Sequence, residues 1–176
     1  MSFPSVATRS FPRPRGGKQT LAAVALATLV LAGCGASSTQ YRVVEGRGYS
    51  FEAPVGWTLV HTPRAVGMQH GNVDLVQVTR LPLSRRYRPQ LFGAVVPELD
   101  RTATELARDA GATLQERQTL QVLGQAVRQY ELSFPGHVEQ LTFVLRGKSN
   151  YQLLCRREDG ADDAACKRLV SSFRIF

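Results

Sequence analysis

A short apolar run of Leu, Ala and Val over residues 21–31 ends at a Gly-Cys pair, and this feature decides how much of the chain is available to fold. The segment Leu31-Ala32-Gly33-Cys34 has the form of a lipobox, where a signal peptidase cuts before the cysteine and the freed cysteine carries acyl chains. Four basic residues before the run supply the n-region of a signal peptide. We therefore expect residues 1–33 to be a lipoprotein signal peptide and residues 34–40 to be the lipidated Cys34 with a short linker.

Two other interpretations of this leader fit less well. An ordinary secretory peptide would be cut after an Ala-x-Ala-like site, and residues 27–29 do not continue into one. An uncleaved anchor helix would need about 20 apolar residues to cross a bilayer. The lipid anchor predicts a location at the outer face of a bacterial cell membrane, with the acyl chains as the contact to that membrane.

Composition then bounds the rest of the chain. The 22 basic and 14 acidic residues become 18 and 14 when the leader is removed, so the mature net charge is about +4. The predicted location and this modest charge both argue against a nucleic-acid partner. About 140 residues remain, which suits one domain over residues 41–176.

Three cysteines are present, and the anchor uses Cys34. The remaining Cys155 and Cys166 are an even pair in an oxidising compartment, where disulfides persist. A zinc or redox site would favour a two-residue spacing or further ligands, whereas ten residues separate this pair. We expect a structural disulfide between them.

The first half of the domain shows strand patterns and then a helical one. Residues 41–44 and 49–52 flank a glycine-containing turn, and Trp57 is expected to enter the strand at 58–60 as a large core residue. Residues 73–81 have a strand-like pattern, which the segment 84–89 interrupts. Apolar residues at three- and four-residue steps then predict a helix between Leu91 and Gly111, with Pro97 at its start or at a kink. The predicted apolar stripe is Phe92, Val95, Val96, Leu99, Ala103, Leu106 and Ala110.

The second half predicts an antiparallel meander of strands at 114–122, 126–134 and 138–146, with a fourth strand at 151–156 after a turn at 146–150. Asp162 and Asp163 are suited to cap a final helix, and residues 173–176 form a terminal strand or packing tail. This order predicts an α+β fold with one antiparallel β-sheet whose faces are covered by helices.

Residues 49–57, Tyr-Ser-Phe-Glu-Ala-Pro-Val-Gly-Trp, resemble the opening of PsbP-like domains, in which an aromatic strand is followed by Pro-x-Gly-Trp. The extended strand around residues 151–154, the short helix after it and Ser171-Ser172-Phe173-Arg174 are similar to the end of such domains. The resemblance covers most of residues 41–176 and implies an α/β/α sandwich with a binding or accessory role. Because the matching residues are structural, it implies no catalytic residue and no cofactor.

The sequence contains only weak matches to phosphate-binding and metal-binding motifs. Gly147-Lys148-Ser149 resembles the end of a phosphate-binding loop, but Thr142 stands where that motif needs another glycine, and a strand pattern follows instead of a helix. A hairpin turn is the better interpretation. The three histidines, His61, His70 and His137, have no partner at helical metal-ligand spacing, so no metal site is expected, although assembly in space with Asp74 stays open.

The cluster Arg85, Arg86, Tyr87 and Arg88 is a candidate for recognising an anionic surface, with a solvated loop as the alternative. We therefore expect a lipid-anchored extracytoplasmic binding or accessory protein with an unidentified envelope protein or ligand as its partner. The alternatives are a cell-envelope hydrolase with a dispersed active site and a structural subunit of a membrane complex.

Overall fold

The computed structural model describes residues 39–176, so the predicted signal peptide and Cys34 lie outside the described residues. The elements follow the order β1 (Tyr41–Gly46), β2 (Tyr49–Pro54), β3 (Thr58–His61), β4 (Ala65–His70), β5 (Asp74–Tyr87), a short 3-10 helix (Pro89–Leu91), α1 (Phe92–Ala110), β6 (Thr113–Val122), β7 (Gln125–Phe134), β8 (His137–Glu158), α2 (Ala164–Ser172) and β9 (Arg174–Ile175). None of the helices in this part of the chain is long and apolar enough to cross a membrane.

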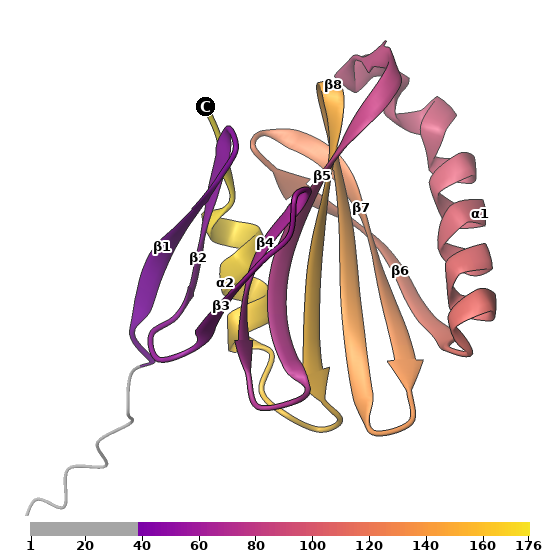
Figure 1. Ribbon diagram of the computed structural model, residues 1–176. Helices are drawn as coiled ribbons and strands as arrows, with labels where there is room; N and C mark the ends of the chain where they lie inside the picture. The colour runs from indigo at the N-terminus through magenta and orange to yellow at the C-terminus, as the bar shows by residue number, and fades with distance from the viewer. Residues whose placement is uncertain (1–38) are drawn as a thin grey trace, which may run out of the picture. The chain divides into compact units, whose positions relative to one another are not determined.

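Two antiparallel sheets organise these elements. The larger has the strand order β3-β4-β5-β8-β7-β6, and the smaller has the order β1-β2-β9. In Figure 1 the large sheet stands between α1 on one side and the layer of β1, β2 and α2 on the other. The predicted α+β class with antiparallel strands and flanking helices is therefore confirmed, while the prediction of a single sheet is wrong, because β1, β2 and β9 pair separately.

The 22-residue β8 folds back on itself. At its open end the Asp159 amide donates a hydrogen bond to the Gly136 carbonyl at 3.3 Å, and Arg156 contacts Glu139 at 2.7 Å. These partners lie about equally far on either side of Gly147, whose φ of 58° supplies the sharp turn. Figure 1 shows the two arms of β8 meeting at the top of the sheet. The predicted hairpin turn at residues 146–150 is thus confirmed.

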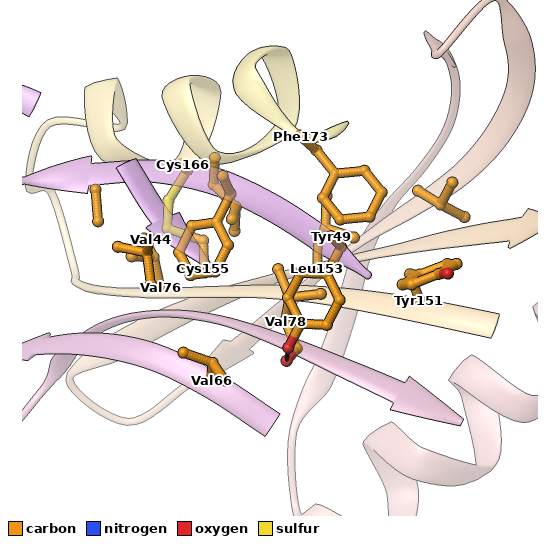
Figure 2. Packing of buried hydrophobic residues seen from close by; sticks show 14 of the residues in the cluster. Val44, Tyr49, Val66, Val76, Val78, Tyr151, Leu153, Cys155, Cys166 and Phe173 are labelled. Carbon is orange, nitrogen blue, oxygen red and sulfur yellow. Dashed lines mark hydrogen bonds between the residues drawn. A yellow bond between two sulfur atoms is a disulfide. The ribbon is translucent and has the colours of Figure 1, made fainter. Parts of the chain in front are cut away.

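The two faces of the large sheet carry separate cores, because successive strand residues point to opposite faces. One core joins Val76, Val78 and Leu153 on the sheet to Phe51 on β2 and Leu169 on α2. Figure 2 shows this packing, with Tyr49 and Phe173 between α2 and the strands. The second core joins α1 to the opposite face of β7 and β8 through the residues Ala103, Ala107, Tyr130, Leu132, Leu141 and Phe143.

Helix α1 lies where the sequence predicted it, but the face that packs on the sheet differs in part from the predicted apolar stripe. It begins at Phe92, contains Pro97 and ends before Gly111, which caps it with a φ of 71°. The predicted stripe included Leu106 and Ala110, but both are exposed, and Ala107 is buried in their place. The buried residues of α1 are the small Ala103 and Ala107, which allow the helix to pack closely on the sheet. The larger Leu106 lies on the exposed side of the helix.

Three details of the strands differ from the sequence expectations. Strand β4 (Ala65–His70) was not predicted, because its buried run lacks the alternation of a half-exposed strand. Strand β5 does not end before Ser84 but continues to Tyr87, with a register shift after Pro82 that pairs Tyr87 with Gly147. Trp57 lies just before β3 and is only partly buried, stacking on His70 with ring centroids 6.0 Å apart.

The C-terminal helix is confirmed. Asp162 accepts a hydrogen bond from the Ala164 amide at 2.9 Å, whereas Asp163, at the N-cap position, makes no side-chain cap bond and pairs with Lys167 instead. After α2 the chain enters β9, which pairs with β2 and so supplies the predicted terminal strand.

Candidate functional site

A cavity of about 420 Å³ opens where the β1–β2 turn, the β3–β4 turn, β5 and the fold of β8 meet. Buried Tyr49, Ala65 and Val66 line its inner part, and the Tyr49 hydroxyl is bonded to the Val78 carbonyl at 2.9 Å. Exposed cationic side chains line the rest, namely Arg47, Arg64, Arg80 and Lys148. No aspartate or glutamate of residues 39–176 lines this cavity, so its electrostatic character is positive.

Arg80 is held in place by neutral groups. Its Nε donates to the Oγ of buried Ser149 at 3.1 Å, and its Nη1 donates to the Arg47 carbonyl at 2.9 Å. The guanidinium also lies over the Tyr151 ring at 5.7 Å. A guanidinium has five N–H donors, and two are used here, so three remain for a ligand.

A second cavity, of about 510 Å³, lies on the other side of the β8 turn. It is lined by Arg86, Arg88 and Arg146 together with Tyr87 and Gly147, and again by no carboxylate among the described residues. Lys148 in the first cavity follows Gly147 in the second, so the two cavities share the β8 turn. We call this region, with the seven cations Arg47, Arg64, Arg80, Arg86, Arg88, Arg146 and Lys148, the basic end.

Three cations away from the basic end are ion-paired, whereas Arg42 near the start of β1 hydrogen-bonds to the Trp57 carbonyl and has no ion pair in the described chain. Arg156 pairs with Glu139 at 2.7 Å, Arg157 with Glu131 at 3.7 Å and Lys167 with Asp163 at 2.9 Å. None of the seven cations of the basic end forms an ion pair within the described chain. The fold therefore concentrates uncompensated positive charge at one end, which favours binding of an anion.

The predicted recognition cluster belongs to this region in part. Arg85, Arg86 and Arg88 are exposed, and Arg86 and Arg88 line the second cavity. Tyr87 is only 7% exposed, and its burial raises the pKa of the hydroxyl, so it serves packing rather than surface contact. β5 stays extended through this segment, and after the register shift that follows Pro82 it pairs buried Tyr87 with Gly147.

The sequence did not show that the four cations of the first cavity lie together. Arg47, Arg64, Arg80 and Lys148 span about a hundred residues and come from four different elements or turns. Each stands in or next to a turn or in β5, and only the topology that brings these turns to one end could have grouped them. Cys155 and Cys166, in contrast, form the predicted disulfide, with a Cα–Cα distance of 5.3 Å.

The histidines are not brought together. His61 lines the first cavity, His70 stacks on Trp57, and His137 stacks on Phe134 with ring centroids 4.5 Å apart. Residues 39–176 contain no group of three side chains that could hold a metal ion. The buried Ser149 hydroxyl accepts a hydrogen bond from Arg80, and no carboxylate of the described residues lines the cavity beside it. The chemistry that these groups offer is anion binding.

Comparison with solved structures identifies the fold. The solution structure of cyanobacterial PsbP (CyanoP) from Synechocystis sp. PCC 6803 matches with a TM-score of 0.60 at 14% identity, covering 83% of this chain and 99% of that one. A crystal structure from Bacteroides thetaiotaomicron matches with a TM-score of 0.43 at 11% identity, covering 78% of this chain and 48% of that one. No protein-family model and no curated protein matches the sequence. The chain has a PsbP-like fold, as residues 49–57 predicted.

Proposed function

We propose that this protein is a lipid-anchored binding protein of the bacterial cell envelope, held at the outer face of the membrane by acyl chains on Cys34. Its basic end captures an anionic partner. The observation that carries this proposal is the concentration of seven cations around two cavities at one end of the described chain, with no ion pair and no carboxylate in the lining of either cavity.

The position of Tyr41, where the linker joins the domain, favours a partner of the basic end in the aqueous space over the lipid surface. Tyr41 begins β1 at the end of the β1–β2 hairpin that lies opposite the turn with Arg47. The six residues of β1 span about 20 Å, and the six linker residues 35–40 can add about as much again. An anchor on Cys34 therefore lets the basic end point away from the membrane.

Binding of a short acidic probe tests the proposal. The full chain in dodecyl maltoside micelles is titrated against fluorescein-labelled octaglutamate, and binding is followed by fluorescence anisotropy. We expect binding that weakens as salt rises from about 50 to about 300 mM, because attraction between exposed charges is screened. Replacing Arg85, Arg86 and Arg88 by Ser should weaken it about tenfold, since each exposed pair contributes up to about 1 kcal/mol.

A variant with the same loss of charge elsewhere provides the control. Arg101, Arg108 and Lys167 are exposed, lie away from the basic end, and make ion pairs with Glu98, Asp109 and Asp163. Replacing these three by Ser should leave octaglutamate binding nearly unchanged. Equal weakening of octaglutamate binding in both triple variants would show that only the net charge of the protein matters, which would contradict the proposal. An affinity that does not change with salt concentration would also contradict it.

A further inference from the structure

We propose that the 420 Å³ cavity around Arg80 is a specific site for the phosphate group of a small phosphorylated ligand. This inference deepens the proposed function, because it assigns one chemical class to one cavity of the basic end. Its volume suits a small molecule, since such sites measure about 300–1,000 Å³.

The donors of the cavity match a phosphate better than a carboxylate. A carboxylate has two oxygens and one charge, and a single guanidinium satisfies it. This cavity offers four cations, and Arg80 alone has three N–H groups without a protein acceptor in the described residues. A phosphate monoester has three terminal oxygens and close to two negative charges at neutral pH, so it can bond to several of these donors together.

The site is partly prepared before a ligand arrives. Ser149, Arg47 and Tyr151 fix the Arg80 guanidinium by two hydrogen bonds and one ring contact. Less ordering entropy is then lost when the guanidinium binds an anion. Ser149 is 7% exposed and uses its oxygen as an acceptor, so its hydroxyl hydrogen remains a donor.

The lining of the cavity has a cationic part for the phosphate and an apolar part for the rest of the ligand. Tyr49, Ala65 and Val66 are buried, and Pro63 and Pro82 complete an apolar surface beside the cations. The cations are suited to hold the phosphate while this surface contacts a small organic group. The same monoester chemistry occurs in a soluble phosphate ester and in the headgroup of phosphatidic acid.

Calorimetric titration of the full chain in dodecyl maltoside with glycerol 3-phosphate tests the inference. Saturable binding is expected, with none for glycerol. The double variant Arg64→Gln/Lys148→Gln should bind at least about tenfold more weakly, because a hydrogen bond to a charged group contributes enough for such a change. These two side chains make no hydrogen bond to the described residues, so the variant should fold, whereas Arg80→Gln also loses contacts to Ser149 and Tyr151.

Mixed micelles distinguish the two sources of the phosphate. If phosphatidic acid in the micelle weakens glycerol 3-phosphate binding and phosphatidylcholine does not, the lipid headgroup occupies the same cavity. If neither lipid has an effect, the site takes soluble esters only. Both outcomes support phosphate recognition.

The inference and the proposed function fail differently. Absence of glycerol 3-phosphate binding, or binding that the double variant retains in full, would overturn the phosphate site even if octaglutamate still binds. Absence of octaglutamate binding with intact glycerol 3-phosphate binding would instead exclude an acidic polymer as the partner of the basic end and leave the phosphate site standing. Replacing Arg101 and Arg108 by Gln removes the same charge from α1 and should leave the titration unchanged.

Discussion

The Tyr130 hydroxyl on β7 donates a 2.7 Å hydrogen bond to the Asp100 carboxylate on α1. Arg128 on the same strand donates to this carboxylate from Nε at 2.9 Å and from Nη2 at 3.3 Å. The apolar contact between α1 and the sheet is small, since its fully buried helix residues are Ala103 and Ala107. These polar bonds therefore make a large contribution to the attachment of the helix.

Asp100→Asn should loosen α1 and change the pH dependence of stability. Hydrogen bonding from Arg128 lowers the pKa of Asp100, partly opposed by burial. A carboxyl with a lowered pKa stabilises the fold fully above its unfolded pKa of about 3.9, and this contribution is lost as pH falls through the folded pKa. Urea unfolding should show the variant about 1–2 kcal/mol less stable at pH 7. The difference should shrink at about pH 3, and a difference that stays constant with pH would contradict this account.

The disulfide should be a major source of stability. Cys155 near the end of β8 and Cys166 in α2 are both buried and close a loop with a sequence separation of 11. The chain-entropy model gives about 3 kcal/mol for such a loop. Replacing both cysteines by Ala should lower the free energy of unfolding by about that amount, measured by urea denaturation. Thiol titration of the unreduced, unfolded mature protein should find neither cysteine free, and two reactive thiols would contradict the bridge.

The fold of β8 depends on the backbone freedom of Gly147. Its φ is 58°, and a Cβ there would meet nothing within 4 Å, so the cost of a side chain is conformational rather than steric. Gly147→Ala should cost about 1–2 kcal/mol of unfolding free energy. Gly147→Asn should cost less, because asparagine enters the left-handed region more readily. Equal stability of the two variants and the wild type would contradict this explanation of the turn.

The proposed lipid anchor leads to a separate prediction. Cells grown with labelled palmitate should incorporate the label into the wild-type protein and not into Cys34→Ala, because we propose that the thiol of Cys34 is the acyl acceptor. The variant should accumulate as unprocessed or released protein. Incorporation of the label into both proteins would remove the anchor from the proposed function.

Local patterns predicted much of the fold. The β1–β2 hairpin, the β6–β7–β8 meander, the turn at Gly147 and the helix that ends at Gly111 each have periodicity or glycine chemistry in the sequence. The disulfide followed from the count of cysteines and the predicted compartment. Strand β4 escaped prediction because both of its edges are paired and its side chains are mostly buried, which removes the alternating pattern.

The candidate site was predicted only in part, since Arg85, Arg86 and Arg88 are neighbours in sequence but Arg47, Arg64 and Lys148 are not. Turns far apart in the chain meet at the basic end because β1, β3, β5 and the first arm of β8 all run toward it (Figure 1). Long-range strand pairing sets this arrangement, and a single sequence read by local pattern does not contain it.

The most direct test of the basic end as the binding surface is arginine footprinting with phenylglyoxal, read by mass spectrometry on the full chain with and without octaglutamate. The probe should slow modification of Arg64, Arg86 and Arg146, which are exposed and unpaired in the described chain. Modification of Arg101 and Arg108 on α1 should keep its rate. Equal protection of both groups, or protection of neither, would contradict the assignment of binding to the basic end.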